Sequence, residues 1–388
     1  MTNLSYSDEE AGDAPNGNVR RDAGRNASRA EGTGKDAGAH DTAQEPFADL
    51  SPDAILNAVD SVLDAEGSGT GVRTSGQVLA LNSYENRVFQ IGLEAGPGSG
   101  EGALAANSLV AKFYRPARWT DAQIQEEHDF LFELVESEVP AVAPLRLQGA
   151  SLHHCGGFRF ALFERRGGRA PELSEAPVRE RIGRFLGRLH GVGGRSPYRA
   201  RLSLDTDAFG REPSQYLLTH DWLPPELGAT YRGLVDHALE EIERAFERAG
   251  AVRKLRVHGD CHLGNMLWNE AQAEPGPLFL DFDDSVMAPA VQDLWMLLSG
   301  DRAEMEMQLR DVLRGYEMFL PFDRSQLLLI EPLRTLRLIH YAAWIARRWS
   351  DPAFPAAFPW FPLPRYWESR ILELREQIAA MQEIPISD

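Results

Sequence analysis

The sequence predicts an α+β fold with two lobes, a small β-rich lobe followed by a mainly helical one. Five strand-like segments and two helices precede residue 165, and the strands are expected at 77–81, 86–93, 109–114, 142–147 and 158–163. After Glu164 the hydrophobic periodicity changes to that of long helices. We therefore expect an N-lobe over residues 47–163 and a C-lobe over residues 164–388.

The first 46 residues differ from the rest in composition. They are rich in Ala, Gly, Asp, Glu, Asn and Arg, and Tyr6 is their only aromatic residue. Such a segment buries too little apolar surface to offset the entropy of ordering its backbone. The sequence predicts a disordered tail over 1–46, and a Gly-rich loop or insertion over 94–108.

Helices are predicted by caps and by apolar stripes. Ser51 and Pro52 are typical of a helix start, and the segment opened by Trp119, Thr120 and Asp121 predicts a second N-lobe helix. The inner face expected for this second helix consists of Ile124, His128, Leu131, Leu134 and Val135. The expected C-lobe helices are Val178–His190, Pro213–Leu218, Glu226–Ala249, Pro289–Leu298, Glu304–Leu320, Gln326–Trp349 and Arg365–Met381.

Composition excludes several classes of function. The formal net charge is −18, and no basic run stands out, so binding to a nucleic-acid backbone is not expected. No stretch of about 18 apolar residues is present to span a membrane, and the amino terminus lacks a secretory signal. Cys155 and Cys261 lie far apart without metal-ligand spacing, which favours reduced thiols and a cytoplasmic location.

One constellation carries chemistry. Asp260 is followed five positions later by Asn265, and Asp281 ends an apolar strand 16 positions further on. A turn between the two strands would bring three oxygen donors together, and magnesium prefers such ligands while taking others from phosphates. The pattern suits phosphoryl transfer in which Asp260 accepts a hydroxyl proton while Asn265 and Asp281 hold the metal.

Lys112 lies in the middle of the apolar strand LVAKFY. An ammonium group is costly there unless it meets an anion. A nucleotide phosphate and a helix carboxylate would supply that partner, and the candidates are Glu127 and its neighbour Glu126.

The segment HGDCHLGN followed by LDFDD resembles the protein-kinase-like phosphotransferases of the aminoglycoside phosphotransferase and choline kinase type. Further segments, among them LNSYENRVFQ, VAKFYRPARWT and YAAWIARRWSDPAFP, resemble bacterial stress-response protein kinases of that fold. The resemblance covers about residues 50–382. It implies a bilobal protein-kinase-like fold, with ATP as co-substrate and Mg²⁺ as cofactor.

Position by position, the resemblance implies that Asp260 is the proton acceptor and that Asn265 and Asp281 are the magnesium ligands, with Asp281 also counted as catalytic. It makes Lys112 the phosphate-contacting lysine and Ser83 an ATP-contacting residue. Two departures stand out: the turn that would cover the phosphates is NSYENR without GxGxxG, and position 262 is His where Ser/Thr protein kinases have Lys.

The predicted function is an ATP- and Mg²⁺-dependent Ser/Thr protein kinase that acts on a protein hydroxyl. The alternative is a small-molecule kinase acting on a hydroxyl of a cationic metabolite or antibiotic, which His262 and the acidic net charge keep open. A pseudokinase is not expected, because the base, the lysine and the metal ligands are all present. Neither nucleic acid nor membrane is an expected partner, and a monomer is the default.

Other polar residues near the motif have less exotic interpretations. Asp293 is expected to be structural, accepting backbone N–H groups of the catalytic loop. Asp283 and Asp284 are expected either near the metal or as a helix N-cap. Cys261 is predicted to be a buried thiol. The pair Arg347 and Arg348 is expected to cap a helix end, with recognition of an acidic peptide as the alternative.

Overall fold

The computed structural model describes residues 45–63, 71–81, 83–95, 107–268 and 275–388. The tail predicted for 1–46 lies outside these residues except for its last two positions. Most of the predicted 94–108 loop and part of the turn after Trp268 lie outside them as well. The description below concerns the compact unit Glu45–Asp388.

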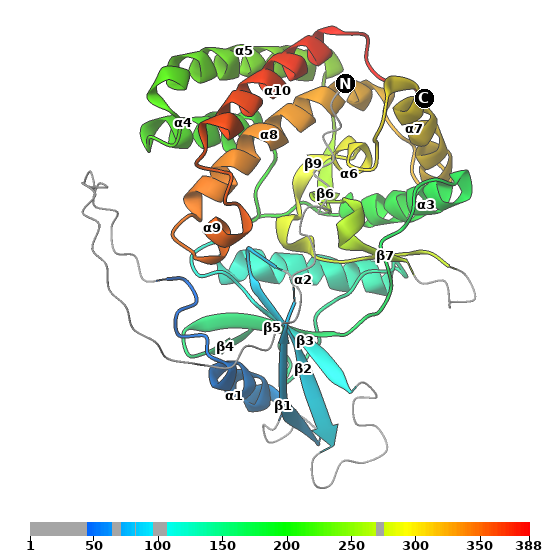
Figure 1. Ribbon diagram of the computed structural model, residues 1–388. Helices are drawn as coiled ribbons and strands as arrows, with labels where there is room; N and C mark the ends of the chain where they lie inside the picture. Colours follow the sequence, from blue (N-terminus) through cyan, green and yellow to red (C-terminus); the bar gives the residue numbers. More distant parts are fainter. Residues whose placement is uncertain (1–44, 64–70, 82, 96–106, 269–274) are drawn as a thin grey trace, which may run out of the picture. The chain divides into compact units, whose positions relative to one another are not determined.

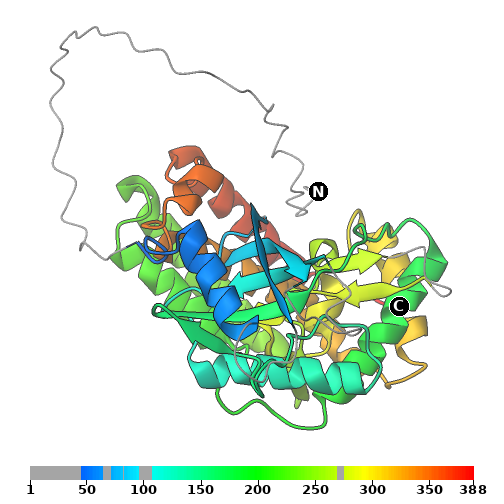
Figure 2. The ribbon, with the colours of Figure 1, turned by 90° about the horizontal axis from the view of Figure 1, so that it is seen from below.

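The N-lobe is built on a five-stranded antiparallel sheet (Figure 1). The strand order is β1-β2-β3-β5-β4, and the strands are β1 (Val72–Ala80), β2 (Arg87–Ala95), β3 (Ser108–Phe113), β4 (His153–Cys155) and β5 (Phe158–Glu164). Two helices accompany it, α1 (Pro52–Leu63) and α2 (Asp121–Glu136). Figure 2 shows α1 lying across the sheet. The predicted bilobal α+β class is confirmed.

Alternation along the strands assigns each side chain of the sheet to a face. Leu109, Ala111 and Phe113 of β3 pack in one apolar cluster with α1, together with Phe160 and Leu162 of β5. Ala161 points the other way and packs with Ile124 of α2. Because successive strand residues face opposite sides, Lys112 shares the face that is covered by α2.

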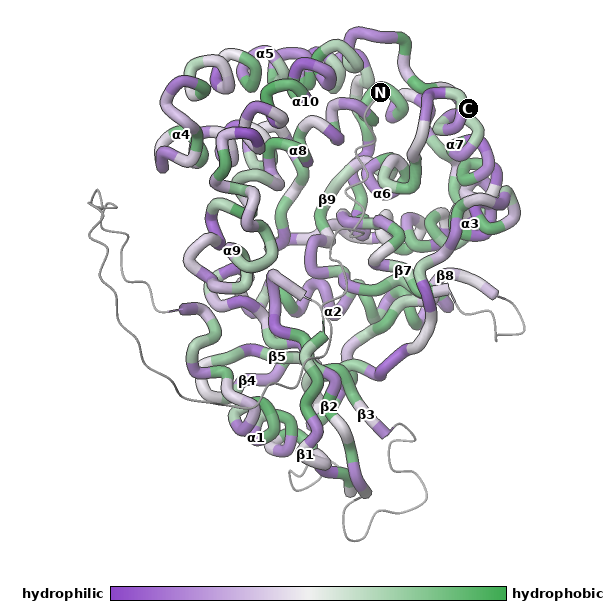
Figure 3. Tube along the Cα trace, viewed as in Figure 1, coloured by the Kyte–Doolittle hydropathy of each residue, from purple (hydrophilic) through white to green (hydrophobic). Residues whose placement is uncertain are grey.

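The C-lobe is mainly helical. Its helices are α3 (Ala176–Gly193), the π-helix η2 (Asp207–Arg211), α4 (Glu212–Thr219), α5 (Pro225–Ala249), α6 (Val291–Trp295), α7 (Arg302–Tyr316), the 3₁₀ helix η5 (Arg324–Leu329), α8 (Ile330–Arg347), α9 (Ala353–Ala357) and α10 (Pro364–Gln382). Hydrophilic and hydrophobic stretches alternate along these helices (Figure 3). The apolar sides form one large core. No helix in the described ranges is long and apolar enough to cross a bilayer.

Two short antiparallel strand pairs interrupt the helices. The strand β6 (Lys254–Val257) pairs with β9 (Val286–Pro289), and β7 (Met266–Trp268) pairs with β8 (Pro277–Phe279). The 3₁₀ turns η3 (Leu263–Asn265) and η4 (Phe282–Asp284) lie between them. The pairing of β7 with β8 confirms the two strands predicted between Asn265 and Asp281, while most of the turn between them lies outside the described residues.

Several predicted elements are wrong in detail. Residues 142–147 form isolated bridges at Pro144 and Leu147 instead of a strand, because a proline cannot donate to a ladder. The fifth strand is β4. Val135 is exposed, since the buried stripe of α2 ends at Leu134.

The helix predicted over Pro289–Leu298 is shorter than expected, because 286–289 pair with β6 and only Val291–Trp295 is helical. The helix predicted from Gln326 begins as a 3₁₀ turn and becomes α-helical at Ile330, two residues before Pro332, which suits a first helical turn. The short helix α9 was not predicted.

Helices α3 and α7 approach each other through glycines. A methyl group on Gly315 of α7 would lie 1.9 Å from the Glu180 carbonyl oxygen, and one on Gly183 of α3 would lie 2.0 Å from the Val312 carbonyl oxygen. Backbone atoms cannot move aside as a flexible side chain can, so both positions require glycine.

We expect Gly315→Ala to lower the free energy of unfolding by about 2 kcal/mol or more, because the helices must separate. Gly233→Ala is the matched control, since it lies in α5 with nothing within 4 Å of the added methyl group. That control should raise stability by about 0.5–1 kcal/mol. Equal effects in urea unfolding of the two variants would contradict the close helix contact.

Candidate active site

The loop that carries Asp260 follows strand β6, and its backbone is hydrogen-bonded to one buried carboxylate. Asp293 accepts hydrogen bonds from the backbone N–H of His258 at 2.8 Å and of Gly259 at 2.9 Å. His190 contacts the same carboxylate through Nε2 at 3.0 Å, and the Asp293 side chain is fully buried. The predicted structural role of Asp293 is confirmed.

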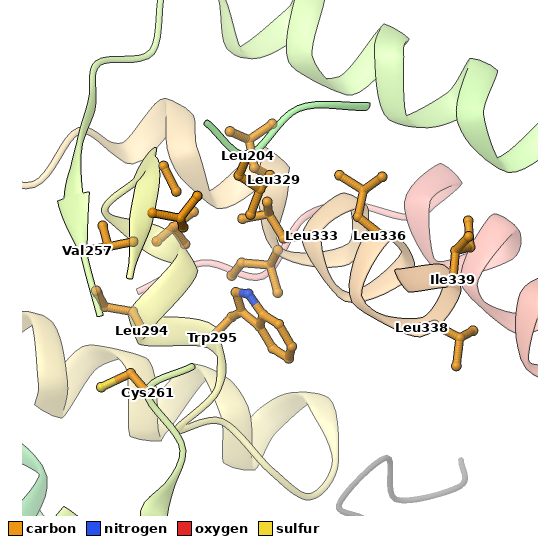
Figure 4. Close-up of a cluster of buried hydrophobic side chains, with 14 of the residues drawn as sticks. Leu204, Val257, Cys261, Leu294, Trp295, Leu329, Leu333, Leu336, Leu338 and Ile339 are labelled. Carbon is orange, nitrogen blue, oxygen red and sulfur yellow. The ribbon is translucent and has the colours of Figure 1, made fainter. Parts of the chain in front are cut away.

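Apolar contacts anchor the same loop on both sides of Asp260. Val257 and Cys261 are fully buried, and they lie together with Leu294 in the C-lobe core (Figure 4). Burial raises the pKa of the Cys261 thiol well above its usual value. Cys261 is therefore a protonated packing residue, as predicted, and the backbone of the loop is fixed before and after Asp260.

Asp260 is held by three polar side chains. Its Oδ1 accepts from Arg337 Nη1 at 2.6 Å, and its Oδ2 lies 3.3 Å from Asn265 Nδ2 and 3.4 Å from His262 Nε2. Burial alone would raise the pKa of Asp260, but Arg337 and His262 lower it below its ordinary value. Asp260 is therefore a carboxylate at neutral pH, able to accept a proton.

Asn265 and Asp281 are brought together by the β7–β8 ladder. Met266 pairs with Phe279, and the Leu280 N–H donates to the Asn265 carbonyl at 2.9 Å. Asn265 therefore lies across from Leu280, beside Asp281. Asp281 has a φ of 51°, in the left-handed region, and its side chain is 52% exposed.

Lys112 lies among three carboxylates. Its Nζ is 2.9 Å from Asp281 Oδ1, 3.2 Å from Asp283 Oδ1 and 3.7 Å from Glu127 Oε1. Burial alone would lower the pKa of Lys112, but the three carboxylates raise it well above its usual value. The ammonium group is therefore charged and points at the Asp281 segment.

The structure distinguishes the two glutamates proposed as partners of Lys112. Glu127 is buried on the inner face of α2 and contacts both Lys112 and Arg201 Nη1, the latter at 3.2 Å. Glu126 instead accepts from the backbone N–H groups of residues 199–201 at 2.7–3.0 Å. Glu127 is thus the lysine partner, and Glu126 ties α2 to the C-lobe.

Asp283 and Asp284 do not cap a helix, which corrects one of the two expectations, because they lie in η4 and strand β9 follows. Asp283 is buried and is bound by Arg118, Lys112 and Asn86, whose Nδ2 donates at 3.1 Å. Arg118 also contacts Asp284. Arg118 was missed in the sequence, although it stands in the segment YRPARWT.

Ser83 is half-buried and directly precedes the turn 84–86. The Asn86 side chain links this turn to the rest of the site, because Oδ1 accepts from the Arg115 N–H at 3.0 Å while Nδ2 binds Asp283. The turn is thus attached to the Asp281–Asp284 segment through Asn86.

The same turn is bound by the C-lobe through Glu85, which contacts Arg115, Arg348 and the Trp344 indole N–H. The Asp351 carboxylate forms ion pairs with Arg87 at 2.8 Å and with Arg115 at 2.5 Å. Arg348 was expected only to cap a helix end. It does donate to the Trp344 carbonyl at 3.1 Å, but it also pairs with Glu85 of the N-lobe.

Comparison with known proteins agrees with this geometry. Residues 77–330 match the profile of the family described as Phosphotransferase enzyme family (APH). Stress response kinase A of Escherichia coli K12 is 40% identical over 340 residues, which cover 88% of this chain and 96% of that protein. A relative in Salmonella typhimurium, called serine/threonine protein kinase RdoA, is 39% identical over the same shares.

Solved structures with the same fold have lower sequence identity. An amicoumacin kinase in complex with AMP-PNP, Ca²⁺ and its antibiotic has a TM-score of 0.60 at 18% identity, covering 81% of this chain and 90% of that one. A microcompartment-associated aminopropanol kinase has a TM-score of 0.57 at 18% identity, covering 80% and 93%. With the profile match and the relatives at about 40% identity, the chain belongs to the phosphotransferase enzyme family and is an ATP-dependent phosphotransferase.

Proposed function

We propose that the chain is a Ser/Thr protein kinase in which Asp260 is the base, Asn265 and Asp281 hold Mg²⁺, and Lys112, Ser83 and Glu127 serve the nucleotide. The observation that carries the proposal is the placement of an ionised Asp260 beside Asn265, while Lys112 reaches Asp281 from the other lobe. Protein as the substrate is supported by a relative of nearly full length that is named a serine/threonine protein kinase.

The donor set fits a magnesium ion. No cluster of three or more His, Cys, Asp and Glu able to hold a metal occurs in the described ranges, and the proposed donors are one carboxylate and one amide. Asn265 Nδ2 points to Asp260, which leaves its amide oxygen for another partner, and Asp281 is half-exposed. Two protein oxygens, with phosphate and water completing the shell, suit Mg²⁺. Bound there, the ion would neutralise charge on the ATP phosphates.

The protein's own groups then have distinct tasks. Lys112 binds the phosphates, and Glu127 orients it from α2. Asp260 accepts the proton of the acceptor hydroxyl as the hydroxyl oxygen bonds to the γ-phosphorus and the bond from phosphorus to the β–γ bridging oxygen breaks.

Cytoplasmic location stays a prediction.

A small-molecule hydroxyl kinase is the second candidate. His262, two positions after the base, is 41% exposed on its side chain and is the specific observation in its favour. The deciding experiment incubates the full chain with γ-labelled ATP and Mg²⁺. It compares transfer to itself, to generic proteins, and to amino alcohols and aminoglycosides. Label confined to the small molecules would replace the protein-kinase proposal.

Asp260→Asn should retain nucleotide binding and lose about 10²- to 10⁴-fold in turnover, because the amide cannot accept the hydroxyl proton. The measurement is phosphoryl transfer together with ATP affinity from calorimetry. Cys261→Ser, a change at the neighbouring buried residue, serves as a control for loop damage. Undiminished turnover in Asp260→Asn would remove this residue from the mechanism.

Asp281→Asn should weaken Mg²⁺-dependent nucleotide binding and turnover, since an amide does not supply the charge that holds a dication. Titration of ATP with and without Mg²⁺ measures the effect. Asp284→Asn is the control, because Asp284 is a nearby half-exposed carboxylate paired with Arg118. A wild-type Mg²⁺ dependence in Asp281→Asn would move the metal site elsewhere.

Lys112→Ala should weaken ATP use strongly, and Glu127→Gln should do so less, because Glu127 acts through the lysine. The double variant should be little worse than Lys112→Ala alone, as expected for residues that act as a unit. Steady-state kinetics of the four proteins form the cycle. If the effects of the two single variants multiply in the double variant, the two residues act independently, contrary to their contact.

A further inference from the structure

The proposed base, Asp260, is bound by an arginine that no local sequence motif predicts. Arg337 of α8 donates from Nη1 to Asp260 Oδ1 at 2.6 Å, across 77 positions of sequence. Its side chain is 42% exposed. A guanidinium has five N–H donors in a rigid fork, and Asp260 is its only recorded hydrogen-bond partner among the described residues.

The charges around Asp260 come from several elements. His258 and His262 belong to its own loop, Arg337 to α8, and Asp284 to η4. Asp284 is paired with Arg118, and Asp260 is paired with Arg337. After Glu331, α8 contains no Asp or Glu up to its end at Arg347. On α8, Asp260 is therefore faced by a cation, and the helix has no spare carboxylate after Glu331.

The cation beside Asp260 has the opposite sign to the net charge of the whole chain. A net charge of −18 would attract a cation at long range, but a cationic acceptor whose amine approaches Asp260 would meet the Arg337 guanidinium. An acceptor with a carboxylate beside its hydroxyl would instead find unused N–H donors in a fork that matches a carboxylate.

We propose that Arg337 selects the acceptor: the hydroxyl that Asp260 deprotonates belongs to a peptide segment with an acidic side chain next to the Ser or Thr, and the guanidinium bridges that carboxylate and Asp260. This rests on the proposed function, because it takes Asp260 as the base. Arg337 is on this account a specificity-determining residue.

The test uses the full chain with three serine peptides that differ only in the residues flanking the serine, which are Glu, Gln or Lys. The variants are Arg337→Gln and Arg347→Gln. Arg347 is the matched control, because it is an exposed arginine on the same helix, stacked on Tyr216 and about 15 Å further along the axis.

We expect the wild type and Arg347→Gln to prefer the Glu peptide over the Lys peptide by at least about 10-fold in kcat/KM, through KM, a difference of about 1.4 kcal/mol. Arg337→Gln should bring the three peptides within about threefold of one another.

Three outcomes would overturn the proposal: no acidic preference in the wild type, an unchanged preference in Arg337→Gln, or an equal loss of kcat for all three peptides. The last would place Arg337 on the transferring phosphate. If only small molecules are phosphorylated, the proposed protein-kinase function fails separately, and so does the peptide acceptor assigned here. Circular dichroism melting of each variant ensures that folded proteins are compared.

Discussion

The site is organised by the cost of burying one ammonium group. Lys112 lies within an apolar strand, and its charge is tolerated only because Asp281, Asp283 and Glu127 lie within 4 Å of its Nζ. These three residues belong to the C-lobe segment after β8 and to α2. Compensation of the Lys112 charge therefore brings the sheet, α2 and the candidate metal-binding segment together.

Further cations and an amide share the carboxylates around Lys112, so the charges form a network and not a single ion pair. Asp283 is bound by Arg118 and Asn86 as well as by Lys112, and Glu127 is shared with Arg201. Arg201 also donates to the Asp283 carbonyl and to Ser285 O at 2.8 Å. Losing one partner of a buried pair is costly, and Asp283 and Glu127 are protected from that cost because each has more than one cation or amide donor.

The motif residues could be predicted because their signals are local. Asp260 and Asn265 lie five positions apart, and an apolar strand leads into Asp281, so spacing alone brings them together. Arg118 and Arg337 could not be predicted in the same way, since their partners lie 165 and 77 positions away and an arginine pairs with any carboxylate within reach. The strand expected at 142–147 failed for a local reason, because Pro144 interrupts the ladder.

The unequal exposure of the two aspartates assigns them different parts under the proposed function. Asp283 is almost fully buried and has other donors, so it keeps its charge compensated when Lys112 moves to a phosphate. Asp281 is half-exposed, and Lys112 is its only recorded cationic partner in the described part of the chain. Nucleotide binding would therefore free Asp281 alone at the moment a dication arrives. Asp281 would then be available as one of the two residues that would hold Mg²⁺, while Asp283 and Glu127 would keep their other donors.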